Sequence, residues 1–300
     1  MHYDLLSILY HCYKRDDYSY IEKIRDKISS SGVKGIIANL YFMNEKEMQE
    51  EFGSYYEEID VVKMFSKATQ LFKKYFKIPV IFSIEGCDYI KDTLELEELY
   101  NLGLRNILLV WNHTNKYGGG TYGIGGLTDK GKEFLKKAVE LGISIDLSHM
   151  NEETFFDTVN YLKEEKFSKK PLVIVSHSNS SSIYKHPRNL SDNELEALKG
   201  LGAIVGCVLY LPFIGDGEEM YLEHLRKVIS VLGIDSVGIS TYDMSFACDL
   251  FGEEASKMLY KYEELTNKLN DLFSETFTEE EKKKILYENI FNKLFIERRN

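Results

Sequence analysis

Ile143-Ser144-Ile145-Asp146-Leu147-Ser148-His149 and Leu172-Val173-Ile174-Val175-Ser176-His177-Ser178 are two short, β-branched stretches that both end on Ser-His. The helical stretch between them, from Glu152 to Lys166, is about long enough for one crossover between parallel strands. Two neighbours joined in this way place their histidines side by side at the carboxyl edge of a sheet. The pair therefore predicts a βαβ unit at the centre of the fold.

Similar apolar runs recur along the chain and alternate with amphipathic stretches of helical spacing. The strand-like runs are 2–6, 34–42, 78–85, 106–112, 143–149, 172–177, 203–210 and 236–243. The main helical stretches are 18–29, 61–75, 94–102, 129–141, 152–166 and 221–232, with two closing helices from about 253. This alternation predicts an α/β fold, a (β/α)8 TIM barrel formed by residues 1–300 as a single domain. The alternative is an open doubly wound sheet, but Leu5–Leu9 lacks the glycine-rich phosphate loop usual after its first strand.

Charge and hydropathy exclude several classes of protein. The net charge is −11 and no stripe of Lys and Arg is present, which argues against a nucleic-acid partner. No apolar run reaches the roughly 18–20 residues of a membrane span, and the first residues lack the order of a signal peptide. The four cysteines lie far apart, as expected for reduced thiols. We therefore expect a soluble, cytoplasmic protein.

Five residues have side chains that suit a metal site at the strand ends. His2 and Asp4 are spaced i, i+2 and project from one face of a strand, and Glu85 ends an apolar run. With His149 and His177 they give three imidazoles and two carboxylates, which suit one or two divalent ions of the zinc type. The alternatives are a frayed N-terminus, an exposed carboxylate and two structural histidines.

In several motifs the chain resembles the membrane dipeptidase family, the renal dipeptidase-like metallopeptidases, and in particular its shorter cytosolic bacterial members. The motifs span nearly the whole chain in the family's order. They are His-x-Asp at 2–4, Glu85-Gly86, Leu-Val-Trp-Asn-His-Thr-Asn at 109–115, Gly126-Leu127-Thr128 with Gly131, Ile145-Asp146-Leu147-Ser148-His149, Ser176-His177-Ser178, and His186-Pro187-Arg188-Asn189 followed by Asp192.

The resemblance implies a barrel of the metal-dependent hydrolase type with two Zn²⁺ ions that hydrolyses dipeptides, often with a D-residue at the C-terminal position. His2 and Asp4 would hold one zinc, His149 and His177 the other, and Glu85 would bridge them. A hydroxide shared by the two ions would attack the scissile carbonyl.

The resemblance also implies the residues that bind the substrate. Arg188 would bind the terminal carboxylate of a small peptide, for which its planar fork is suited, although a salt bridge at a helix start is an alternative role. Asn115, Trp111 and Tyr210 are the other expected substrate-binding residues, and core packing is an equally good account of Tyr210. A homodimer is expected only by analogy with similar barrels.

Two motifs depart from the family. In the fourth-strand motif many members have a histidine where this chain has Trp111. The eighth strand of the family ends Gly-Ser-Asp-Phe-Asp-Gly and its first aspartate is the general acid/base, whereas this chain has Thr241-Tyr242-Asp243. Tyr242 and Asp243 are therefore the two candidates for the proton-transfer role, and a tyrosine is a poor base near neutral pH.

These departures leave three hypotheses for the function. The first is a zinc-dependent dipeptidase. The second is a metal-binding barrel whose hydrolase activity is lost or altered because the eighth-strand aspartate is displaced. The third is hydrolysis of a different small amide, such as a cyclic or β-lactam ring, at the same site.

Overall fold

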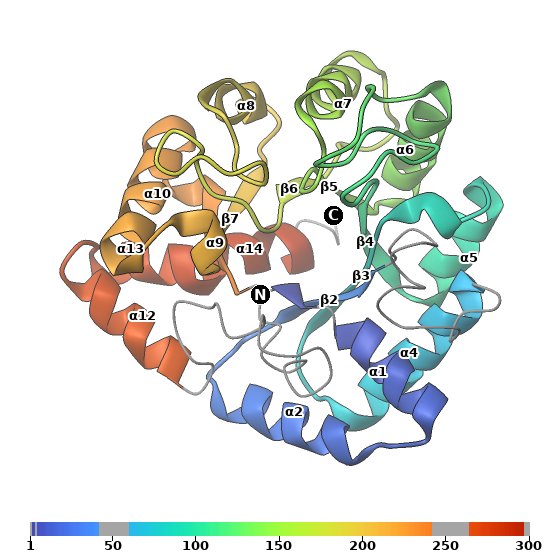
Figure 1. The fold of residues 1–300 in the computed structure, drawn as a ribbon, viewed down its shortest axis with the longest axis horizontal. Coiled ribbons are helices and arrows are strands. Elements are labelled where there is room, and N and C mark those ends of the chain that lie inside the picture. The colour runs from blue at the N-terminus through green and yellow to red at the C-terminus, as the bar shows by residue number, and fades with distance from the viewer. Residues whose placement is uncertain (1, 4, 42–59, 242–263, 297–300) are drawn as a thin grey trace.

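The structure is a barrel of eight parallel strands surrounded by helices (Figure 1). The computed structural model describes residues 2–3, 5–41, 60–241 and 264–296. The strands are β1 His2–Tyr3, β2 Ile36–Tyr41, β3 Val80–Glu85, β4 Leu104–Leu108, β5 Ser144–Asp146, β6 Val173–Val175, β7 Ile204–Val208 and β8 Val237–Ser240. They pair in sequential order from β1 to β8, as the predicted (β/α)8 topology requires.

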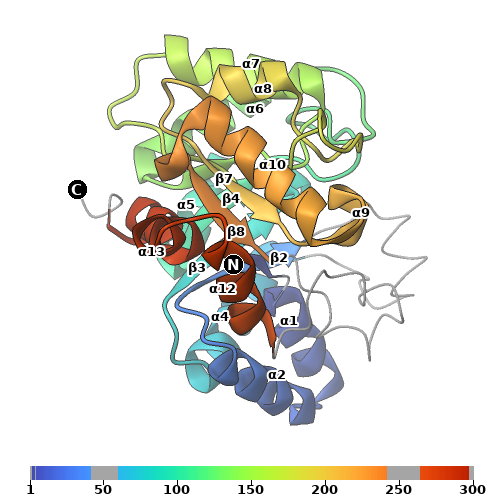
Figure 2. The same cartoon turned by 90° about the vertical axis from the view of Figure 1, so that its left-hand side faces the viewer.

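The helices lie outside the strands, as two views of the molecule show (Figures 1 and 2). They are α1 Leu5–Arg15, α2 Ser19–Ser30, α4 Val61–Tyr75, α5 Thr93–Leu102, α6 Asp129–Leu141, α7 Glu152–Glu164, α8 Asp192–Leu198, α9 Leu211–Ile214, α10 Gly217–Leu232, α12 Leu265–Ser274, α13 Glu279–Lys283 and α14 Asn289–Phe291. Short 3-10 turns η2 Cys87–Tyr89 and η3 Ile234–Ser236 and π-helical segments η6 Lys284–Glu288 and η7 Asn292–Ile296 complete the described elements.

The predicted first strand is wrong over its second half. Residues 2–6 were expected to be extended, but β1 ends at Tyr3 and helix α1 begins at Leu5. Leu5, Leu6 and Leu9 are buried against the core, and together with Ile8 they form a helical apolar face rather than a strand. A short apolar run fits a buried helix as well as a buried strand, and here the helix is formed.

The interior of the barrel has an apolar end and a polar end. Ile37, Ile81 and Ile174 are each the second residue of their strand, and they pack with Leu294 from η7 at the amino end of the barrel. A row of paired positions across β2, β3, β4 and β5 carries polar side chains instead. Asn39, Ser83, Asn106 and Ser144 are all fully buried there. This polar layer separates the apolar end from the carboxyl ends of the strands.

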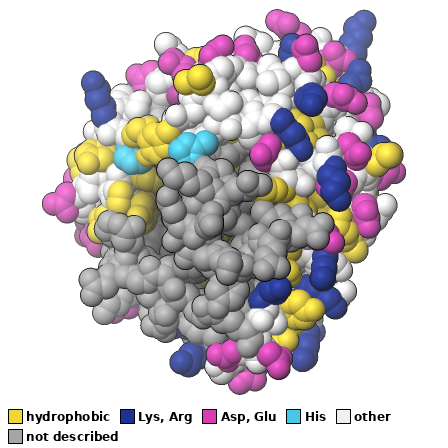
Figure 3. Space-filling model, turned by 45° about the vertical axis from the view of Figure 1, so that its right-hand side comes forward, with side chains coloured by type: hydrophobic (Ala, Val, Ile, Leu, Met, Phe, Trp, Pro, Cys, Tyr) yellow, Lys and Arg dark blue, Asp and Glu magenta, His cyan; other side chains and the backbone are white. Residues whose placement is uncertain are grey.

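The described surface shows no segregated basic stripe on the face in view (Figure 3), as the sequence predicts. On the face shown in Figure 3, acidic and basic side chains are interspersed. Within the part of the chain that the structure describes, no helix has both the length and the apolar character needed to cross a bilayer.

Candidate metal centre

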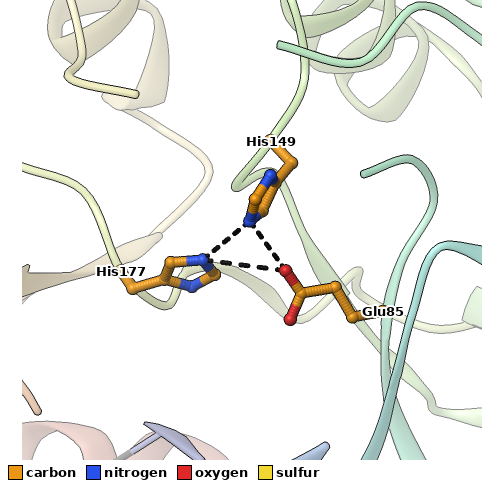
Figure 4. A group of neighbouring side chains, drawn as sticks. All are labelled: Glu85, His149 and His177. Atoms are coloured by element: carbon orange, nitrogen blue, oxygen red, sulfur yellow. Dashed lines mark hydrogen bonds and ion pairs between the residues drawn. The ribbon is translucent and has the colours of Figure 1, made fainter. Parts of the chain in front are cut away.

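Three buried side chains meet at the carboxyl ends of the strands (Figure 4). Glu85 is the last residue of β3, His149 follows β5 by three residues, and His177 follows β6 by two. The Glu85 carboxylate oxygen Oε1 lies 2.7 Å from Nε2 of His149 and 3.9 Å from Nε2 of His177. The two Nε2 atoms are 3.0 Å apart. Three of the five predicted metal ligands therefore converge on one point.

The backbone around this point is shaped to aim the three side chains. Gly86, directly after Glu85, has a φ of 80°, which turns the chain out of β3. His149 has a φ of 71°, a left-handed conformation that is uncommon for any residue other than glycine. Its carbonyl oxygen accepts a hydrogen bond from the Thr121 hydroxyl at 3.2 Å. Such a conformation persists where the surroundings over-determine it, and it occurs often at functional sites.

A polar partner fixes the orientation of Glu85 and of His149. The Asn39 amide donates a hydrogen bond to Oε2 of Glu85 at 2.7 Å, which leaves Oε1 directed at the histidines. The amide oxygen of Asn112 lies 3.1 Å from Nδ1 of His149. Because an amide oxygen only accepts, Nδ1 carries the ring proton, and Nε2 presents its lone pair to the centre.

His177 is oriented in the same sense by its chain neighbour. The Ser176 hydroxyl lies 2.7 Å from Nδ1 of His177, and it also stabilises the charged form of the Asp146 carboxyl, lowering its pKa against the effect of burial. A serine hydroxyl has one proton, so a hydroxyl that donates to Asp146 accepts from Nδ1–H of His177. Nε2 of His177 therefore also presents a lone pair to the centre.

The donor set fits a divalent cation. One carboxylate oxygen and two imidazole nitrogens direct lone pairs at one another within 2.7–3.9 Å, an arrangement that repels unless a positive charge lies between them. Ligands about 2.0–2.1 Å from a tetrahedral zinc ion lie about 3.4 Å from each other, in the middle of this range. The second ring nitrogen of each histidine has a hydrogen-bond partner, as is usual for metal-ligating histidines.

The thiols near the site are kept protonated. Burial raises the pKa of the Cys87 thiol, two residues beyond Glu85, and raises the pKa of Cys207 to about 12. Burial also raises the pKa of Asp146, while hydrogen bonds from Ser176 and Ser148 oppose that effect. A buried, protonated thiol is a poor nucleophile, so the chemistry of this region rests on the carboxylate and the imidazoles.

Two predicted substrate-binding residues lie beside the metal centre. The Trp111 ring is 5.9 Å from the His149 ring, centre to centre, and 6.2 Å from the Tyr41 ring. Arg188 is only 6% exposed, and its Nη2 lies 3.5 Å from the carbonyl oxygen of His177. Trp111 therefore lies next to His149, and Arg188 lies next to His177.

The other two predicted substrate-binding residues have structural contacts. Tyr210 is half-buried and packs edge-on against Phe213, with 5.0 Å between ring centres. The Asn115 amide group donates to the carbonyl of Leu109, and its oxygen accepts from the backbone N–H groups of Tyr117 and Gly118. Asn115 therefore holds the glycine-rich loop in shape.

The remaining predicted site residues lie outside the described side chains. Asp4, Tyr242 and Asp243 are outside the described residues, and so is the side chain of His2. The backbone of His2 belongs to β1 and pairs with Ile37 of β2. Thr241, the last described residue before Tyr242, is fully buried.

Sequence reasoning missed the residues that orient the ligands. Asn39, Asn112, Asp146 and Ser176 each contact a ligand or the partner of a ligand. Asn39 and Asp146 do carry a signal, because each is a polar residue within a strand that is buried, where burial requires a hydrogen-bond partner. Asn112 carries no such signal, since it lies in the loop after β4.

A barrel with a buried carboxylate and two histidines at its strand ends has the fold and the ligand set that a metal-dependent hydrolase requires. The sequence profile described as "Membrane dipeptidase (Peptidase family M19)" matches residues 6–295, and the chain belongs to this family. The predicted resemblance is therefore confirmed, and the family is a class of peptide-bond hydrolases.

Curated relatives and solved structures agree with this assignment. An uncharacterized dipeptidase of Schizosaccharomyces pombe is 30% identical over 62% of the chain and 46% of its own length. An uncharacterized protein of Acinetobacter calcoaceticus is 30% identical over 51% of the chain and 52% of its own length, so the match spans about half of these relatives. A metallopeptidase of Rhodobacter sphaeroides shares the fold, with a TM-score of 0.73 at 18% identity over 98% of this chain and 97% of that one.

Proposed function

We propose that the chain is a zinc-dependent dipeptidase that uses two ions and accepts dipeptides with a D-residue at the C-terminal position. The observation that carries the proposal is the convergence of three lone pairs, from Glu85, His149 and His177, in a buried site. The choice of substrate is supported by the Rhodobacter sphaeroides metallopeptidase of the same fold, which is described as liganded with a phosphinate mimic of the dipeptide L-Ala-D-Ala.

In the proposed site His149 and His177 would hold one ion, His2 and Asp4 would hold the other, and Glu85 would contribute to both. Zinc bound there supplies Lewis acidity, which acidifies water and stabilises the negative charge that develops on the scissile carbonyl oxygen. The protein contributes the orientation of the ligands. Asn112 and Ser176 keep the two Nε2 atoms unprotonated, and Asn39 keeps Oε1 of Glu85 directed at the histidines.

Arg188 binds the substrate carboxylate in this proposal. Its guanidinium lies next to the backbone of His177 and 5.7 Å from the centre of the Phe213 ring. A guanidinium held in this way is pre-organised for a two-point contact with a carboxylate. Trp111 and Tyr210 would also contact the substrate, and Asn115 contributes by holding the loop that follows β4.

Proton transfer to the leaving amine falls to Asp243 or Tyr242, which come after β8 in the sequence. A carboxylate suits this role near neutral pH, whereas a phenol donates a hydrogen bond but is a poor base. We propose the cytoplasm as the location, on account of the reduced and buried thiols, and a homodimer as the assembly.

A second candidate function is metal binding without peptidase activity. The observation that favours it is the eighth-strand sequence Thr241-Tyr242-Asp243, which displaces the aspartate that the family places there. This barrel would bind zinc at the same residues and turn over no dipeptide.

One experiment distinguishes the two functions. Metal-free protein and protein with added Zn²⁺ are assayed for hydrolysis of a panel of L,L- and L,D-dipeptides, and the zinc content of the purified protein is measured. Zinc-dependent hydrolysis supports the dipeptidase. Bound zinc without hydrolysis supports the second function, and protein that binds no zinc contradicts both.

If hydrolysis is found, Asp243→Asn and Tyr242→Phe identify the residue that transfers the proton. Loss of activity in Asp243→Asn, with zinc content unchanged, assigns the role to the carboxylate. Loss only in Tyr242→Phe assigns it to the phenol.

A further inference from the structure

Asp146 is a fully buried carboxylate between the two histidine-bearing loops. It is the last residue of β5, and its Oδ1 accepts hydrogen bonds from the backbone N–H of Ser148 at 3.1 Å and of Ser176 at 3.0 Å. Each of these serines immediately precedes a histidine of the metal centre. One oxygen atom therefore fixes the backbone just before His149 and just before His177.

The serine side chains extend this contact to His177. The hydroxyls of Ser148 and Ser176 both stabilise the charged form of Asp146, lowering its pKa against the effect of burial, and lie 3.4 Å from each other. The Ser148 hydroxyl accepts from the backbone N–H of His177 at 3.3 Å, and the Ser176 hydroxyl lies 2.7 Å from the ring atom Nδ1. Both the backbone and the ring of His177 are thus linked to Asp146 through one hydroxyl each.

The other side of the carboxylate rests on the polar layer of the barrel. The Asn106 amide approaches Oδ2 of Asp146 at 3.5 Å and donates to the Ser83 hydroxyl at 2.9 Å, while its oxygen accepts from Ser144 at 2.6 Å. Among the described residues, Asp146 forms no ion pair with a Lys, Arg or His side chain. Burying a carboxylate without a cation is destabilising, and packing alone does not account for a carboxylate at this position.

We propose that Asp146 is a positioning residue that sets the separation of the two histidine ligands and, through Ser176, keeps the ring proton of His177 on Nδ1. This inference rests on the proposed metal centre. It assigns to Asp146 no contact with the metal or with a substrate.

The variant Asp146→Asn tests the proposal through hydrogen-bond chemistry. The asparagine oxygen can keep the two backbone N–H bonds, but the new NH₂ group donates toward the serine hydroxyls instead of accepting from them. The Ser176 hydroxyl then accepts from the amide and donates its own proton to Nδ1 of His177. This arrangement favours the tautomer with the proton on Nε2, which cannot ligate a metal through that atom.

Two readouts separate this role from general stabilisation. Zinc affinity is measured by competition with a chromophoric chelator, and the tautomer of His177 is read from long-range ¹H–¹⁵N spectra of the metal-free protein. For Asp146→Asn we expect zinc binding weakened about 10- to 100-fold, the size usual for residues that support metal ligands, and a shift of the His177 proton from Nδ1 to Nε2. Asp157→Asn is the matched control. Asp157 also joins two segments, by accepting from the backbone of Leu127, but it contacts none of the three ligands, and we expect no change in either readout.

The outcomes are distinct from those of the proposed function. Wild-type protein that binds no zinc overturns the metal centre itself. If the wild type binds zinc, unchanged affinity and an unchanged tautomer in folded Asp146→Asn overturn the positioning role. If Asp146→Asn does not fold, Ser176→Ala decides, because it removes only the hydroxyl between the carboxylate and the ring. At least fivefold weaker zinc binding in Ser176→Ala supports the role, and unchanged binding overturns it.

Discussion

The two Ser-His dipeptides at the strand ends have the same sequence, but their histidine rings are oriented by different contacts. His177 follows β6 by two residues, and its ring is held by Ser176, its own neighbour in the chain. His149 reaches the centre through a left-handed backbone, and its ring is held by Asn112, which is 37 positions away. Two identical dipeptides at strand ends are therefore oriented toward the metal centre by different contacts. One depends on local hydrogen bonding, and the other depends on a distant loop and a strained φ.

The largest expected effect removes the common function of the two endings. His149→Ala and His177→Ala should each weaken zinc binding by more than the roughly 100-fold upper value for supporting residues, because a ligand itself is lost. His113→Ala is the matched control: His113 is exposed in the loop near His149, and its variant should keep wild-type affinity. Metal content and chelator competition measure all three. Full metal content in either ligand variant would contradict the site.

Lowering the pH should destabilise the segment that follows His177 before the loop that supports His149. Ser180, three residues beyond His177, donates its backbone N–H to Nδ1 of the buried His224 at 3.1 Å, and Nε2 of His224 bonds to the carbonyl of Ile214. An Nδ1 that accepts is unprotonated, and burial lowers the pKa of His224 from 6.5 to about 4. The unfolded chain therefore binds more protons between these values, so this contribution to stability is complete above about pH 6.5 and is lost as the pH falls toward 4.

At pH 5 this loss amounts to about 2 kcal/mol of the free energy of unfolding. Chemical denaturation at pH 7.5 and at pH 5 measures it. In His224→Gln, which keeps an acceptor and a donor without a titrating group, the fall in stability between the two pH values should be smaller by about that amount. Hydrogen exchange of the wild type should show residues 178–190 losing protection before residues 119–128. Equal pH dependence in the wild type and His224→Gln would show that this imidazole does not titrate as described.

The smallest effect tests the distant support of His149. Asn112→Ala removes the acceptor at Nδ1 but leaves the Thr121 contact to the His149 carbonyl, so zinc binding should weaken about tenfold, at the lower end of the range for supporting residues. Asn112→Asp retains an acceptor and should bind zinc at least as well as the wild type. If Asn112→Ala binds zinc normally, the left-handed backbone alone orients His149, and the contrast between the two endings becomes sharper.

Most of the fold could be predicted from the sequence. The helices over 61–75 and 129–141 have the predicted bounds, because their apolar faces are regular and their ends are capped. Asp60 caps the start of the first helix, and Thr128 and Gly142 cap the start and the end of the second. The strand over 2–6 was half wrong because a short apolar run does not distinguish the two conformations.

The site could be predicted only in part. Glu85, His149 and His177 were found because strand ends converge in a barrel, which is a property of the topology. The orienting residues could not be found in this way, because the contact between Asn112 and His149 depends on a loop path and that between Asp146 and Ser176 on the exact offset of two strands. Neither is encoded in a local pattern. The roles of Asp4, Tyr242 and Asp243 stay predictions.

The apolar end of the barrel has a consequence for truncated chains. Ile37, Ile81 and Ile174 come from β2, β3 and β6, whereas Leu294 follows all eight strands in the chain. A chain that ends before residue 294 therefore contains every strand but lacks the side chain that packs against these isoleucines. Such a chain would expose apolar surface at the amino end of the barrel, and exposed apolar surface favours aggregation.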